Sequence, residues 1–173
     1  ERLAALCEAV SRETGLVEPA NVNGPGQIVV SGTREGVEAV AARARAEAGA
    51  KRVVLLEVSG PFHSTLMRPA AERLAELLRE ANFAAPAVPL VANVNAEAAR
   101  DPETIRRQLV EQVCAPVLWE DCVRTLAESG VDTFVEFGPG AVLSGLIRKI
   151  LKDARVFTVN SLDAAREAAA ALA

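Results

Sequence analysis

The sequence has no excess of positive charge and no long apolar run. Its 19 Lys and Arg residues are outnumbered by 23 Asp and Glu residues, which gives a formal net charge of −4. Neither a nucleic acid nor an anionic membrane is therefore expected as a partner. No apolar run approaches the roughly 18 residues that a membrane helix needs. The first residues form no signal peptide and include no initiator methionine, so we expect a piece of a longer protein.

Cysteine and histidine are also scarce. Cys7, Cys114 and Cys122 are widely spaced without a CxxC pair, and His63 is the only histidine. These residues cannot complete a zinc site, and no metal is expected. We expect the thiols to be reduced, small apolar side chains in a cytoplasmic protein. Half of the 173 residues are hydrophobic, which is enough for a packed core.

The first 58 residues alternate between helical and strand patterns. Apolar residues at helical spacing, turn residues at 23–26 and a capping Thr33 delimit the elements. The expected order is a helix over 1–14, strands over 17–22 and 27–31, a helix after Thr33, and a buried strand over 52–58. This order predicts a ferredoxin-like subdomain that lacks its first strand.

Residues 59–173 alternate strands with helices, which predicts a parallel sheet covered on both faces. Expected helices cover 64–82, 102–113, 119–129, 142–151 and 164–172, and expected strands cover 88–91, 132–137 and 155–159. Only three strands would leave an exposed sheet edge. We therefore expect further strands from elsewhere.

His63 is the one plausible general base. It follows the expected strand over 52–58 and precedes a helix, and sites in α/β sheets gather at the carboxyl ends of strands. Histidine titrates near neutral pH, which suits acid–base work. The alternative is a capping or partly buried histidine. Ser64 is interpreted as the helix N-cap and not as a nucleophile, since the sequence holds no G-x-S-x-G elbow.

Other polar residues have both a functional and a structural interpretation. Gly138-Pro139-Gly140 is either a phosphate cradle at a helix start or a tight turn, and we favour the turn. Glu136 is either a site residue or a solvated strand end. Gln112 is a polar residue in an apolar stretch that can satisfy local backbone groups. Trp119 is expected to pack in the core.

Five motifs occur in a fixed order along the chain. They are NVNGPGQIVVSG (21–32), VSGPFHSTLM (58–67), PLVANV (89–94), QVCAPVLW (112–119) and FVEFGPGAVLSGL (134–146). Together they resemble the malonyl-CoA:acyl carrier protein transacylases of bacterial fatty-acid synthesis. The resemblance runs over essentially the whole sequence.

The resemblance implies an α/β fold. Residues 59–173 would be the carboxyl-terminal part of an α/β-hydrolase-like parallel-sheet domain, and residues 1–58 an incomplete ferredoxin-like small subdomain. It also implies transfer of a malonyl group from malonyl-CoA to the phosphopantetheine thiol of acyl carrier protein, through an acyl-serine. No cofactor is implied, since the coenzyme A thioester is the substrate.

The resemblance also assigns roles to individual residues. His63 matches the catalytic histidine, and Gln112 matches the position whose backbone carbonyl orients that imidazole. Asn21 and Gln27 lie in the loop region placed near the acyl pocket and are the expected substrate-binding residues.

The sequence departs from the family in one large respect. The nucleophile elbow, the malonate-binding arginine and the oxyanion loop have no match among the 173 residues. We therefore expect an enzyme fragment that is inactive alone and whose partner is the missing amino-terminal part. Two alternatives stay open: an acyltransferase domain of a polyketide synthase, and a non-catalytic binding module of the same fold.

Overall fold

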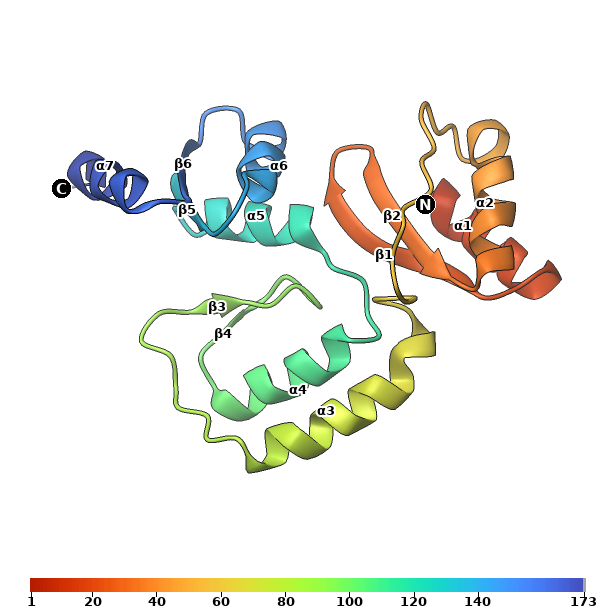
Figure 1. Ribbon diagram of the computed structural model, residues 1–173, viewed down its shortest axis with the longest axis horizontal. Coiled ribbons are helices and arrows are strands. Elements are labelled where there is room, and N and C mark those ends of the chain that lie inside the picture. The colour runs from red at the N-terminus through yellow and green to blue at the C-terminus, as the bar shows by residue number, and fades with distance from the viewer. Residues whose placement is uncertain (173) are drawn as a thin grey trace.

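The computed structural model describes residues 1–172 as an α/β protein (Figure 1). Its strands are β1 (Val17–Gly24), β2 (Gln27–Gly32), β3 (Leu90–Val91), β4 (Ala98–Ala99), β5 (Thr133–Phe137) and β6 (Arg155–Val159). In the described residues these strands form three sheets of two strands each. The pairs β1–β2 and β3–β4 are antiparallel, whereas β5–β6 is parallel.

The amino-terminal region is a β-hairpin covered by two helices, α1 (Arg2–Glu13) and α2 (Arg34–Glu47). The strand and helix predictions are confirmed here to within about two residues. The expected cap is also present, because the Thr33 hydroxyl accepts a hydrogen bond from Gly36 N at 3.1 Å. The shared core of both helices and the first strand is formed by Leu6, Cys7, Val10, Val17, Val40 and Ala44.

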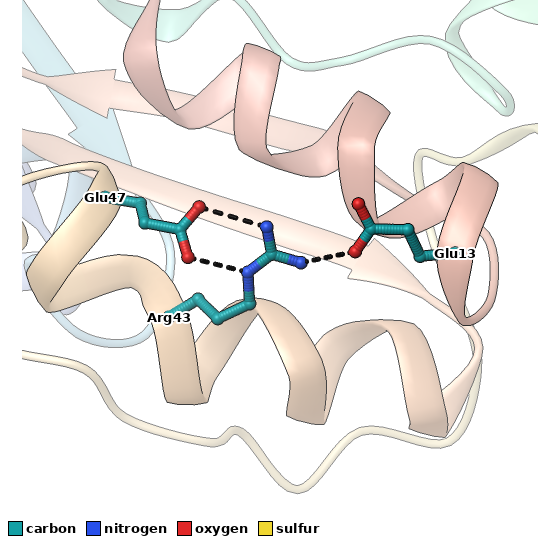
Figure 2. Close-up of polar contacts among 3 residues, drawn as sticks. All are labelled: Glu13, Arg43 and Glu47. Carbon is teal, nitrogen blue, oxygen red and sulfur yellow. Dashed lines mark hydrogen bonds and ion pairs between the residues drawn. The ribbon is translucent and has the colours of Figure 1, made fainter.

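An ion-pair cluster ties α1 to α2 on the surface (Figure 2). Arg43 donates two hydrogen bonds to Glu47, at 2.8 and 3.0 Å, and a third to Glu13 at 2.8 Å. The Arg43 hydrogen bonds hold the pKa of the Glu47 carboxyl below its usual value. Such exposed pairs contribute modestly to stability, so the packing of the two helices depends mainly on the apolar core beneath them.

The rest of the chain contains two further helical groups (Figure 1). The turn η1 (Thr65–Met67) leads into α3 (Arg68–Glu80), which packs beside α4 (Pro102–Gln112). The helices α5 (Trp119–Glu128) and α6 (Val142–Ile150) pack on β5 and β6 around Val123, Phe134, Ile147 and Ile150, with Trp119 against them. The terminal helix is α7 (Leu162–Leu172). No helix within residues 1–172 combines the length and the apolar character needed to cross a membrane.

The predicted strand over residues 52–58 is wrong for this chain. The segment is irregular, and Val54, Leu55, Leu56 and Val58 have exposed fractions of 55% to 66%. A strand exists only when a neighbouring strand accepts its backbone hydrogen bonds, and the described residues place none beside this segment. The strand expected over 88–91 is limited to β3, which pairs with the unforeseen β4.

Candidate active site

The structure brings His63 and Gln112 together across 49 residues of sequence. The His63 Nδ1 lies 3.0 Å from the backbone oxygen of Gln112. A carbonyl oxygen only accepts hydrogen bonds, so Nδ1 carries the proton and donates it. The neutral ring then has its lone pair on Nε2. The side chain is half-buried and not sealed in the core, so the arrangement is suited to a general base.

The free carbonyl of Gln112 follows from its place at the end of α4. The last carbonyls of a helix have no partner within the helix. The amides of Cys114 and Ala115 both donate to Glu111 O, which leaves Gln112 O for the imidazole. The Gln112 side chain in turn donates to Ala115 O at 2.9 Å and so holds the turn after the helix.

His63 lies in a turn that is held from both ends. Its φ of 59° is in the left-handed region that favours glycine. Ser64 is fully buried and donates its hydroxyl to Pro61 O at 2.6 Å. Ser64 does occupy the expected N-cap position of the helical turn at Thr65–Met67, but its side chain makes no capping hydrogen bond. A carboxylate oxygen of Glu18 takes the place of that bond by accepting from Thr65 N at 2.7 Å, a contact that no local sequence pattern signals.

The two expected substrate-binding residues lie at different distances from the His63–Gln112 pair. Asn21 is in the middle of β1, opposite Val117 in a parallel bridge. Gln27 is at the far end of the hairpin, where its side chain accepts from Lys149 Nζ at 3.4 Å. Its partner Gly24 lies six residue steps along β1 from Glu18, which is about 20 Å. Asn21 is thus the nearer of the two to the imidazole along the strand.

An open hollow of about 560 Å³ adjoins the end of α4 that carries Gln112. It lies between α3 and α4, and most of its lining is apolar. The lining includes Ala71, Ala75, Val94, Val110, Cys114 and Ala115. Neither His63 nor Gln112 belongs to the lining of this hollow.

The Gly138-Pro139-Gly140 segment is a turn whose helix start is already occupied. The Glu136 carboxylate accepts hydrogen bonds from Leu143 N at 3.1 Å and from Ser144 N at 2.7 Å. These are the free amides that a phosphate would need. The hydrogen bonds from Ser144 hold the pKa of the Glu136 carboxyl below its usual value. The turn interpretation is thus favoured over the phosphate cradle, and Glu136 acts as a helix cap.

Replacing Glu136 with glutamine is expected to lower the melting temperature at neutral pH. The folded-state pKa of this carboxyl lies below its unfolded value. Its stabilising contribution is therefore present above the unfolded pKa and is lost as the pH falls through the folded pKa. Thermal melts of both proteins between neutral and acidic pH should show the difference shrinking as the pH falls. A difference independent of pH would contradict the capping role of the charge.

Comparison with known proteins places the chain in a family. A family model described as "Acyl transferase domain" matches residues 3–170, and the chain belongs to this family. Among curated relatives, the malonyl CoA-acyl carrier protein transacylase of Bacillus subtilis is 45% identical over 160 residues, which is 92% of this chain and 50% of that protein. The chain spans about half the length of the curated relatives it matches.

Solved structures agree with this assignment. The acyl-carrier-protein S-malonyltransferase of Bartonella henselae is 44% identical, with a TM-score of 0.91 over 98% of this chain and 54% of that one. A malonyl-transacylase solved in complex with its type II polyketide acyl-carrier protein is 38% identical, with a TM-score of 0.91 over 96% of this chain and 53% of that one. The α/β architecture described above is thus that of the malonyl-transacylase structures.

Proposed function

We propose that this chain supplies the acid–base half of the active site of a malonyl-CoA:acyl carrier protein transacylase. The observation that carries the proposal is the 3.0 Å contact between His63 Nδ1 and Gln112 O, which leaves Nε2 free to accept a proton. The names of the relatives support the reaction type and the two substrates. The carrier protein bound in the polyketide relative supports acyl carrier protein as a partner.

The chemistry is a ping-pong transfer in two matched steps. In the first, His63 Nε2 takes the proton of a serine hydroxyl while the serine oxygen attacks the malonyl thioester carbon. The carbon–sulfur bond then breaks, and the coenzyme A sulfur leaves with that proton. In the second, Nε2 takes the proton of the phosphopantetheine thiol, the thiolate attacks the serine ester, and the serine oxygen leaves as the reprotonated hydroxyl.

An uncharged partner for the imidazole suits this substrate. In the best-known triads a buried carboxylate orients the histidine, whereas here a backbone carbonyl does so. A malonyl group carries its own carboxylate, which a second negative charge beside the base would repel. We assign Asn21 to the substrate side of the site because β1 runs past the residues around His63 and Gln112.

The serine must come from polypeptide outside these 173 residues, because the sequence holds no G-x-S-x-G elbow. We propose that the amino-terminal half of the same family fold is the partner. It would supply strands for residues 52–58, whose consecutive apolar side chains are typical of a strand buried on both faces. Residues 1–58 would then form the ferredoxin-like subdomain, and residues 59–173 part of the hydrolase-like sheet. A cytoplasmic location fits the three free thiols.

The chain alone is expected to transfer no malonyl group, because a base without a nucleophile forms no acyl-enzyme. A chimera that places the amino-terminal half of the Bacillus subtilis relative before Glu1 is expected to restore transfer. The assay follows radiolabelled malonyl from coenzyme A to carrier protein. Binding of a hydrophobic dye to the chain should fall in the chimera as the apolar segment is covered.

Transfer by the chain alone would contradict the proposal, as would an inactive chimera that melts cooperatively. A competition assay with a fatty-acid carrier protein and a polyketide carrier protein as acceptors decides between a role in fatty-acid synthesis and a role in polyketide synthesis. The carrier that receives more malonyl identifies the role. The polyketide alternative rests on the relative solved with such a carrier.

A further inference from the structure

The strand β1 contacts both segments that carry the His63–Gln112 pair. Its backbone forms a parallel bridge with Val117, five residues after Gln112. Val22 N donates to Val117 O, and Val117 N donates to Ala20 O, each at 2.8 Å. These bonds fix the position of the chain that follows α4 relative to the small subdomain.

The same strand holds the His63 segment through a side chain. One carboxylate oxygen of Glu18, Oε2, accepts from Thr65 N at 2.7 Å and from Thr65 Oγ1 at 3.0 Å. Thr65 is the first residue of η1, where backbone amides lack partners within the helix. Hydrogen bonds to a charged acceptor are stronger than neutral ones. Glu18 therefore anchors the chain two residues after His63.

The turn at His63 needs such an anchor. A non-glycine residue in the left-handed region is disfavoured and persists only where the surroundings hold it. The Ser64 hydroxyl restrains the turn on the Pro61 side, and Glu18 restrains it on the Thr65 side. Without Glu18, the backbone at His63 is free to relax toward an ordinary φ, which moves the ring away from Gln112 O.

We propose that Glu18 is a positioning residue that keeps His63 Nδ1 against the Gln112 carbonyl and thereby leaves Nε2 without a proton. The consequence for catalysis rests on the proposed transacylase function, whereas the effect on the ring does not. The small subdomain thus contributes to the base through β1, which holds the histidine turn with one side chain and the segment after Gln112 with its backbone.

The test uses the ring itself, because His63 is the only histidine in the 173 residues. In a sample with ¹⁵N-labelled histidine, long-range proton–nitrogen correlation spectra report which ring nitrogen carries the proton. They are recorded on the full chain at a pH high enough for a neutral ring. The parent chain is expected to show the Nδ1–H tautomer, since the bond to Gln112 O requires it.

Two variants break the contact from opposite sides. Glu18→Leu keeps the bulk of the side chain and removes the acceptor. Thr65→Pro removes both donors at a helix start where proline fits, and the preceding Ser64 already has the extended conformation that proline requires. Both are expected to lose the dominant Nδ1–H tautomer in favour of the Nε2–H form that free histidine prefers. Glu18→Gln retains an acceptor and is expected to restore the parent spectrum.

The matched control is Glu13→Gln, which removes a carboxylate of the same subdomain that binds Arg43 instead. It is expected to leave the tautomer unchanged. Amide spectra of each variant report whether the chain is folded. A folded Glu18→Leu or Thr65→Pro variant that keeps the Nδ1–H tautomer would overturn the proposal.

In the chimera, the same two variants are expected to lower kcat by about ten- to a hundredfold with KM unchanged. If the variants of the chain show the tautomer shift but the unmutated chimera is inactive, the positioning role of Glu18 is supported and the transacylase function is refuted.

Discussion

Replacing His63 with glutamine in the active chimera is expected to reduce kcat for malonyl transfer by about a thousandfold. A positioned general base contributes roughly 10²–10⁴-fold to such a reaction, and glutamine cannot accept a proton at neutral pH. The side chain is half-buried and belongs to neither hydrophobic cluster, so the substitution leaves both clusters intact. The measurement is steady-state transfer to carrier protein with malonyl-CoA as donor.

Folding and activity must be separated in this experiment. The melting temperature of the His63→Gln chimera should lie within a few degrees of the parent, because the glutamine occupies the same turn. Glu13→Gln, which alters only the ion pair with Arg43, should retain full turnover. A His63→Gln chimera with parental kcat would remove the assigned role of the imidazole.

Replacing Gly32 with alanine is expected to destabilise the amino-terminal hairpin and its two helices by about 3 kcal/mol, because overpacking against a rigid backbone is costly. A Cβ at this position would lie 2.0 Å from Leu16 O and 2.7 Å from Val17 Cα. Both are backbone atoms, and Leu16 O already accepts from Thr33 N at 2.8 Å. The hairpin must therefore open at the end where α2 begins. Urea unfolding followed by circular dichroism measures the loss.

Gly145 provides the matched control for the Gly32 substitution. It lies inside α6, and a Cβ there meets nothing within 4 Å. Alanine at this position is expected to be neutral or stabilising by up to about 1 kcal/mol, because it favours the helix more than glycine does. Equal stability of the two alanine variants would show that the close approach at Gly32 is relieved without cost.

Helices and strands whose ends and apolar spacing are both marked by nearby residues were predictable from the sequence. The helix over 34–47 has a threonine cap and apolar residues at helical spacing, and the strand over 155–159 has the bounds expected. The segment over 52–58 has an equally clear strand pattern and forms none. Its pattern describes a position inside a sheet, and a sheet requires neighbouring strands that the described residues do not place there.

The site was predictable only in part. The motif around His63 identified the imidazole, and the family resemblance pointed to the Gln112 carbonyl, which lies 3.0 Å away in the structure. Ser64 has the N-cap position that serine before a helix usually takes, but its hydroxyl makes no capping hydrogen bond. Here the Ser64 hydroxyl donates back to Pro61 O, and the cap comes from Glu18, which is 47 residues from Thr65.

The sequence by itself determined the family, the single imidazole and the helices whose apolar spacing repeats every few residues. These properties depend on neighbours within a few turns of chain. The tertiary structure alone decided which nitrogen of His63 faces the Gln112 carbonyl, and that a carboxylate from β1 holds the turn. Hydrogen bonds form only within about 3.5 Å, and a local pattern does not record which distant residues folding brings that close.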